Sequence, residues 1–218
     1  MPLRDALAAR TGLPVVVHND LVARTEAERW FGAGREHDTF ALVTIGAGVG
    51  MGLVVHGRLV TSPDSGLGLV GHHPLDAAGP RCSEGHRGCA SALLSLWGVQ
   101  GQVSAAVGRW VGYDEALDLA AAGAPGATEA VRDAGRALGL LVATVANLTL
   151  ARTVVLGGEG VRLAEVAADA VAAGLAEHRD PDAAPVPLVV RGHDRTEWAR
   201  GGAVTAIQAL VTGGAAGA

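Results

Sequence analysis

The loop at residues 71–89 contains the side chains best suited to metal or thiol chemistry. It reads GHHPLDAAGPRCSEGHRGC and includes three of the eight histidines and both cysteines of the chain, Cys82 and Cys89. A disulfide, a metal site or a chance grouping would each account for this concentration. Cytosolic thiols are normally kept reduced, so the disulfide is the weakest of the three explanations if the protein is cytoplasmic.

The pair Asn19-Asp20 is the second candidate for chemistry. It ends the run LPVVVHND (13–20), which predicts a buried strand, and it precedes LVARTEAERWFGAG (21–34), which has helical spacing and ends in glycines. Asn and Asp both cap helices well, and the end of a strand is where α/β proteins form ligand sites. The pair can therefore cap the helix, form part of a site, or do both.

The elements that must hold these residues alternate between strand and helix patterns. FALVTIGAGVGMGLVVHGRLV (40–60) predicts two strands joined by a glycine-rich turn, with His56-Gly57 forming the next turn. Thr128 is a candidate cap for a long helix over 129–147 with one apolar face. We further expect short helices over 90–103 and 113–123, a strand in 152–160, a helix at 161–177, a strand in 180–192 and a last helix over 197–211.

Charge and hydropathy exclude several classes of function. The net charge is −5 and no block is rich in lysine or arginine, so we expect no direct DNA binding by this chain. The opening MPLRDALAARTG predicts an amphipathic helix and not a signal peptide. The longest apolar stretch is interrupted by Asn147 and Arg152, which predicts a core helix followed by a strand and no membrane span. We therefore expect a cytoplasmic protein.

Four segments, taken in order, resemble the ROK family, which joins sugar-responsive repressors with bacterial sugar kinases. The family has segments close to NDANAAALGE, GTGVGGG, GEIGH…GPxCxCGxxGCLE and VVLGGG. The corresponding segments here are HNDLVARTEAE, GAGVGMG, GLVGHHPLDAAGPRCSEGHRGCAS and VVLGGEG. A single glycine motif would be weak evidence, but four in the same order are specific. The resemblance runs from about residue 2 to the last helix.

This resemblance implies the fold. It is the α/β C-terminal lobe of an actin-like, hexokinase-like (ribonuclease H-like) two-lobed ATPase fold, in agreement with the alternating elements. Residues 1–218 would then form a single ROK-type domain with a zinc-loop insertion at 71–89. The helices in 1–12 and 197–218 would pack toward the N-terminal lobe, which leaves apolar residues such as Leu3, Leu7, Val204, Ile207 and Leu210 partly uncovered.

The resemblance also implies a structural zinc ion. The family's signature loop binds zinc through one histidine and three cysteines, and His72, Cys82 and Cys89 match three of those ligands by position. The remaining family cysteine falls on Glu84. A carboxylate can ligate zinc, although less softly than a thiolate. His86 and the histidine after His72 are nearby substitutes.

A sugar site is the third implication. In the family's kinases the aspartate of the Asn-Asp pair is a general base that deprotonates the sugar hydroxyl attacking ATP, and this aspartate is Asp20 here. Asn19 would hydrogen-bond a sugar hydroxyl, and His72 would stand in the same wall of the cleft. The two glutamates with which the family grips sugar hydroxyls are replaced by Leu69 and Ser91.

The phosphate-binding positions are only partly kept. The threonine of the family's GTGVG is Ala47 here, which removes a hydroxyl donor, and the 218 residues contain no Asp-x-Gly-x-Thr segment like the family's first phosphate loop. ATP and magnesium are therefore expected only if the chain is a kinase. The positions that correspond to nucleotide-binding loops are Gly46, Ala47, Gly48, Gly50, Gly157 and Gly158.

These departures favour a binding module over an enzyme. The preferred hypothesis is the part of a ROK-family transcriptional regulator that senses a sugar or phosphosugar effector, without catalysis. The alternative is a ROK-family sugar kinase, glucokinase-like and ATP-dependent, represented by an incomplete chain. With apolar residues left uncovered, we also expect a homo-oligomer, most simply a dimer.

Overall fold

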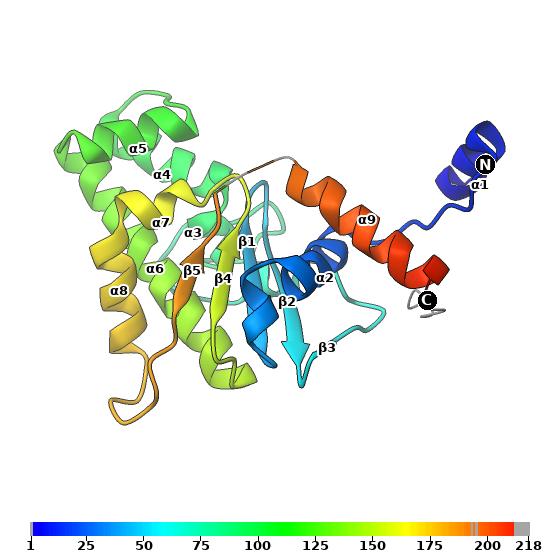
Figure 1. Ribbon diagram of the computed structural model, residues 1–218. Coiled ribbons are helices and arrows are strands. Elements are labelled where there is room, and N and C mark those ends of the chain that lie inside the picture. The colour runs from blue at the N-terminus through cyan, green and yellow to red at the C-terminus, as the bar shows by residue number, and fades with distance from the viewer. Residues whose placement is uncertain (1, 193, 195, 212–218) are drawn as a thin grey trace.

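A five-stranded mixed sheet forms the centre of the molecule (Figure 1). The computed structural model describes residues 2–192, 194 and 196–211. The strand order is β3-β2-β1-β4-β5, in which β1 pairs antiparallel with β2 and parallel with β4. The strands are β1 (Phe40–Ile45), β2 (Val49–Val55), β3 (Arg58–Leu59), β4 (Val154–Gly157) and β5 (Leu188–Val190). The predicted strands over 40–60, 152–160 and 180–192 are confirmed.

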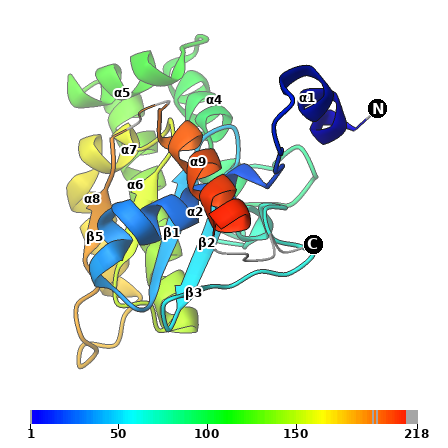
Figure 2. The same cartoon turned by 45° about the vertical axis from the view of Figure 1, so that its right-hand side comes forward.

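Helices cover both faces of this sheet. On one face α2 (Asp20–Phe31) lies against the strands and α9 (Thr196–Val211) crosses over α2, as both views show (Figures 1 and 2). On the other face the long helix α6 packs against α8, α5 and α4. The helices of that layer are α3 (Ala90–Leu94), α4 (Leu96–Val107), α5 (Tyr113–Ala121), α6 (Pro125–Thr149), α7 (Arg162–Val166) and α8 (Ala168–Glu177).

Strand β1 divides the core into two parts, and all six of its residues are buried. Side chains alternate between the faces of a strand, so Ala41, Val43 and Ile45 join the large apolar core on the α6 side. Phe40 and Leu42 join a smaller cluster on the α2 side. A continuous apolar run of this kind is typical of a strand covered on both faces.

The first element stands apart from the rest of the molecule. Helix α1 (Leu3–Thr11) has no buried residue and lies away from the sheet in both views (Figures 1 and 2). The strand predicted at 13–20 is wrong: residues 14–19 have no regular secondary structure. A strand requires a hydrogen-bonded neighbour, and no strand among the described residues pairs with this segment.

Three further expectations need correction. The long helix begins at Pro125, which suits the first helical position, and the Thr128 hydroxyl does not cap it but donates to the Ala120 carbonyl at 3.1 Å. The helix predicted at 161–177 is divided in two at Ala167. The aromatic residue Phe31, near the end of the predicted helix at 21–34, suggests core packing, yet its side chain is 58% exposed. None of the described helices is long and apolar enough to cross a membrane.

Candidate functional site

A cleft of about 570 Å³ opens where β1 and β4 end side by side. Because these neighbours run parallel, their carboxyl ends meet at one edge of the sheet, which is the usual position of a ligand site in α/β folds. The glycine-rich segment 46–50 leaves β1 at this edge, and the turn Gly157-Gly158 leaves β4. The cleft is lined by Asp20, Leu21, Thr44, Ile45, Gly46, Ala47, Gly48, Val49, Gly50, Gly66, Gly68, Leu96, Glu159 and Trp198.

The glycine-rich segment is held in place by backbone hydrogen bonds. The Gly46 amide donates to the Gly48 carbonyl at 2.9 Å, and the Leu96 amide at the start of α4 donates to the Gly46 carbonyl at 2.9 Å. On the second strand, Gly158 has a φ of 99°. A Cβ atom at Gly158 would lie 2.2 Å from the Ile45 carbonyl oxygen. Only glycine permits this backbone conformation and this close approach together.

Asn19 and Asp20 begin α2, and their side chains face different hollows. The Asn19 Oδ1 atom accepts the Val22 amide at 3.1 Å, so it caps the helix. Asn19 also lines a second hollow of about 540 Å³ together with His18 and residues 61–63 and 65. Asp20 is exposed and lines the glycine-rich cleft.

Arg24 lies directly beneath the cleft, one turn further along α2. Its side chain is 1% exposed, and none of its three guanidinium nitrogens has a hydrogen-bond partner. The Trp198 ring covers the guanidinium, with its centroid 4.8 Å from the Arg24 Cζ atom. Desolvation lowers the pKa of Arg24, and the carboxylates of Glu197, Glu28 and Glu159 oppose that shift. The charge of this arginine is therefore balanced by neighbouring carboxylates without direct hydrogen bonds.

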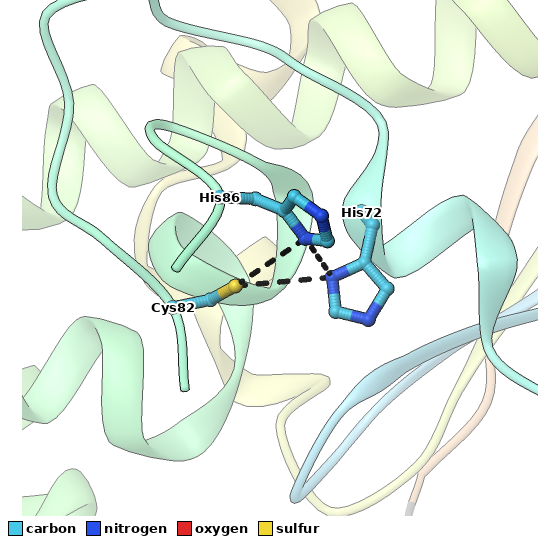
Figure 3. Close-up of side chains that lie close together, drawn as sticks. All are labelled: His72, Cys82 and His86. Carbon is cyan, nitrogen blue, oxygen red and sulfur yellow. Dashed lines mark hydrogen bonds between the residues drawn. The ribbon is translucent and has the colours of Figure 1, made fainter. Parts of the chain in front are cut away.

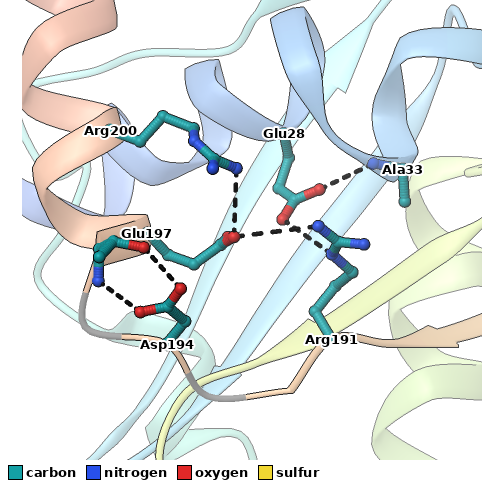
Figure 4. Close-up of polar contacts among 7 residues, drawn as sticks. Glu28, Ala33, Arg191, Asp194, Glu197 and Arg200 are labelled. Carbon is teal, nitrogen blue, oxygen red and sulfur yellow. Dashed lines mark hydrogen bonds and ion pairs between the residues drawn. The ribbon is translucent and has the colours of Figure 1, made fainter.

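An ionic network joins α2 to the segment that leads into α9 (Figure 4). Glu28 is 2% exposed; it accepts the Ala33 amide at 2.9 Å and lies 3.7 Å from the Arg191 Nε atom. Glu197 lies 3.9 Å from Arg191 and 3.4 Å from Arg200. Glu197 and Trp198, at the start of α9, both interact with Arg24 of α2 and so contribute to the α2–α9 contact.

A separate cluster of side chains forms in the loop at 71–89 (Figure 3). The Nδ1 atoms of His72 and His86 are 3.1 Å apart, and each lies 3.8 Å from the Cys82 Sγ atom. The bridge between Arg81 and Arg87 closes a tight hairpin, and the Cys82 amide donates to the His86 carbonyl within it at 2.9 Å. This hairpin turns Cys82 and His86 toward His72.

The other predicted ligands occupy different places. Glu84 is at the tip of the hairpin, with its carboxylate 3.4 Å from the Ser83 hydroxyl, and it does not belong to the three-residue group. His86, which the sequence offered as a substitute, belongs to that group. Cys89 is fully buried at the start of α3, and it too lies outside the three-residue group. His72 does not line the glycine-rich cleft among the described residues.

The pKa values of the two thiols, Cys82 and Cys89, are shifted in opposite directions. Desolvation opposes ionisation of Cys82, but hydrogen bonds from the Cys89 thiol and from the backbone at Glu84 and His86 outweigh it and lower its pKa. Burial raises the pKa of Cys89, although backbone hydrogen bonds from Ala92 and Ser91 partly offset the effect.

The spacing of these atoms suits a tetrahedral zinc ion. With Zn–N bonds of about 2.05 Å and a Zn–S bond of about 2.3 Å, two ligand nitrogens lie about 3.3 Å apart and nitrogen and sulfur about 3.6 Å apart. The observed separations of 3.1 and 3.8 Å are close to these values. Two imidazoles and a thiolate also form a donor set that zinc prefers, and Cys89 remains the fourth ligand that the family resemblance implies, although it lies outside the three-residue group.

The family's sugar-gripping glutamates have no carboxylate counterparts at the expected positions. Leu69 is 62% exposed in the short 3-10 turn before the loop. The Ser91 hydroxyl lies close to Gly71, where a Cβ atom would be 2.5 Å from it. The carboxylates that do reach the glycine-rich cleft belong to Asp20 and Glu159.

Three similar proteins agree with this description. Glucokinase of Thermotoga maritima is 45% identical over 101 residues, which are 46% of this chain and 32% of that protein. The DNA-binding transcriptional repressor Mlc of Escherichia coli is 29% identical over 175 residues, 76% of this chain and 43% of that protein. The ROK hexokinase of Thermus thermophilus superposes with a TM-score of 0.78 and 29% identity, covering 94% of this chain and 71% of that structure.

The sheet order and the cleft define an α/β protein of the hexokinase-like type, as predicted. The chain belongs to the ROK family, whose model matches residues 1–209. It spans a third to somewhat under half of the length of the two curated relatives described above.

Proposed function

We propose that this chain is the sugar-sensing part of a ROK-family transcriptional regulator and that it transfers no phosphoryl group. The observation that supports this most directly is the lining of the glycine-rich cleft. It offers the carboxylates of Asp20 and Glu159 as acceptors for sugar hydroxyls, and no arginine is among the described residues that line it. Similarity to the repressor Mlc over 76% of the chain agrees with a sensing role.

The same lining is poorly suited to phosphoryl transfer. That reaction depends on positive groups that neutralise the charge on the transferring phosphate. Arg24 lies beneath the cleft, but it is buried under Trp198. Ala47 offers no hydroxyl where the family has threonine. A sugar could therefore bind through hydroxyl–carboxylate hydrogen bonds without any step that consumes ATP.

We also propose a single domain over 1–218 whose first and last helices contact the N-terminal lobe of the family's two-lobed fold. Helix α1 has no buried residue. On α9, Ile207 and Leu210 are 46% and 55% exposed. An apolar surface of this kind is commonly covered by a partner. Val204, which we expected to be uncovered, is only 2% exposed because it packs within the α2–α9 contact.

In this proposal the loop at 71–89 binds one structural zinc ion through His72, Cys82, His86 and Cys89. The spacing of His72, Cys82 and His86 supports this ligand set. Compared with the ligands expected from the sequence, His86 takes the place of Glu84. Bound zinc would cross-link the hairpin at 81–87 to the 3-10 turn that ends at His72. The loop has little apolar packing of its own, so such a link would contribute directly to its stability.

A sugar kinase is the second candidate. Asp20 lies in the cleft where a general base could accept the proton of a sugar hydroxyl. The segment of 101 residues that is 45% identical to a glucokinase favours this function. In that case ATP and magnesium would be required. Most contacts to the ATP phosphates would have to come from residues other than the 218 of this sequence.

A phosphoryl-transfer assay separates the two candidates. The purified chain is incubated with ATP, magnesium and a panel containing glucose and N-acetylmannosamine, with an active ROK glucokinase assayed alongside. The regulator proposal predicts no sugar phosphate above background. Turnover that disappears in an Asp20→Asn variant would overturn it and establish the kinase.

A further inference from the structure

The carboxylate of Glu159 occupies the space between the two glycine turns of the cleft. A Cβ atom built on Gly46 would lie 2.4 Å from the Glu159 Oε2 atom, so this oxygen rests directly against the first turn. Glu159 itself follows Gly157-Gly158, the second turn, and it lines the cleft. The side chain therefore bridges the ends of β1 and β4.

The backbone on both sides of Glu159 is fixed, which limits where its side chain can go. The Gly160 amide donates to the Ile45 carbonyl at 2.9 Å, and the Tyr113 hydroxyl donates to the Gly160 carbonyl at 2.7 Å. Gly158 packs against the Ile45 backbone so closely that no side chain would fit there. Burial raises the pKa of Tyr113, which therefore remains a neutral donor. The turn thus presents Glu159 to the cleft in a defined position.

Without Glu159, this place would attract an anion. Glycine-rich turns bind phosphates through their backbone amides. The Arg24 guanidinium lies immediately behind the second turn, where a Cβ atom on Gly157 would be 2.4 Å from its Nη2 atom. Glu159 is one of the carboxylates whose charge acts on Arg24. A protein carboxylate thus already compensates the positive potential that would otherwise reach the cleft.

We infer that Glu159 makes this cleft selective for uncharged sugars and excludes phosphorylated ones. A phosphate monoester carries about −1.5 to −2 charges at neutral pH, and it would meet two carboxylates, those of Glu159 and Asp20. An uncharged sugar would instead donate its hydroxyls to them. The part of this inference that concerns sugars rests on the proposed sensing function, whereas the exclusion of phosphate does not.

Titrations followed by ligand-observed NMR test the inference, because the method detects millimolar binding. The probes are glucose, glucose 6-phosphate and inorganic pyrophosphate. The proteins are the wild type, Glu159→Gln, Glu159→Ala and the control Glu129→Gln, which removes another exposed carboxylate, on α6. We expect the wild type to bind glucose but neither phosphate compound. Affinity for pyrophosphate and glucose 6-phosphate should rise about tenfold in both Glu159 variants and stay unchanged in the control.

Two results would overturn the inference: equal affinity of the wild type for glucose and glucose 6-phosphate, or no gain of phosphate affinity in either Glu159 variant. The variants are checked for folding by thermal unfolding, and two different replacements guard against the failure of one. If the wild type binds none of the sugars while the Glu159 variants gain pyrophosphate, the sensing function fails and the role of Glu159 stands.

Discussion

The two faces of the central sheet are covered by helices of very different composition. On the α6 face the buried residues are almost entirely alanine, valine and leucine. On the other face α2 buries eight consecutive residues, Leu21 to Glu28, and these include Arg24, Glu26 and Glu28. Burying charged side chains costs free energy unless they are paired. The α6 face therefore stabilises the fold, whereas the α2 face contains buried charges beneath the glycine-rich cleft that cost free energy.

The position of the charges explains why that cost is tolerated. Glu28 and Glu197 neutralise Arg24 and Arg191 close to the carboxyl ends of β1 and β4, where the cleft opens. The α6 face has no comparable group of buried charges among the described residues. The α6 side therefore holds the fold together, and the buried charges of the α2 side lie next to the cleft in which we propose that ligand binds.

A truncation in the α6 face should have the largest effect on stability. Leu138 lies on α6 and is fully buried in the large apolar core. Leu138→Ala should lower the free energy of unfolding by about 3 kcal/mol, because it removes buried apolar area and leaves a cavity. Leu148→Ala on the same helix is the control, since Leu148 is 77% exposed; its effect should stay within about 0.5 kcal/mol. Urea unfolding measures both, and similar values would contradict the assignment of the α6 face as the stabilising one.

The loop at 71–89, in which we propose that zinc binds, covers neither face of the sheet. Loss of the metal should therefore destabilise the protein less than Leu138→Ala does. We expect metal analysis to find close to one zinc per chain in protein prepared without chelators. Cys82→Ser should abolish that zinc and lower the free energy of unfolding by about 2–3 kcal/mol, because metal binding stabilises only the folded loop. Ser83→Ala, one residue away, should retain the metal. Zinc-free wild-type protein would rule the site out.

Removing one charge from the α2 face should have a smaller but distinct effect. Glu28→Gln keeps the volume and the acceptor for the Ala33 amide, but it removes a negative charge near Arg191 and Arg24. We expect a loss of about 1–2 kcal/mol, because buried positive charge is left less compensated. Glu177→Gln, at the exposed pair with Arg136, should change stability by less than about 0.5 kcal/mol. Equal effects in urea unfolding would show that burial of Glu28 has no energetic role.

The exposed apolar residues of α9 should affect association and not stability. We expect the wild type to sediment as a dimer at micromolar concentrations, because Ile207 and Leu210 stay uncovered in a single chain. Leu210→Glu should shift the protein to a monomer without changing its unfolding midpoint. Leu148→Glu, an equally drastic change at an exposed site of the α6 face, should leave the dimer intact. A monomeric wild type would contradict the prediction.

The sequence predicted most elements of the fold because their apolar periodicity is local. The strands around His56-Gly57 and the apolar face of α6 are examples. The strand at 13–20 failed, since an apolar run does not reveal whether a pairing partner exists. Arg24 was not recognised as buried, because a helical pattern assigns a charged residue to the solvent side. That burial depends on α9, which lies far away in sequence.

The sequence could predict only those residues of the candidate site that match the motifs of the family. Asp20 and the glycine-rich segment 46–50 lie at one cleft, and His72 lies with Cys82 in one loop; their roles as site residues stay predictions. The participation of His86 follows from the hairpin geometry, which spacing alone does not determine. Glu159 was not singled out within VVLGGEG, because its proximity to Gly46 arises from the parallel pairing of β1 with β4. That pairing is a long-range contact with no local signal.

Hydrogen–deuterium exchange with and without millimolar sugar is the sharpest test of whether ligand binds in the glycine-rich cleft at the carboxyl edge of the sheet. We expect added protection of amides in residues 19–22 and 44–50, with α6 and α8 unchanged. A smaller hollow of about 300 Å³ on the α6 side, lined by Thr128, Arg132, Glu165 and Asp169 among others, provides the competing location. Protection confined to the segments around that hollow, or no protection anywhere, would contradict binding in the glycine-rich cleft.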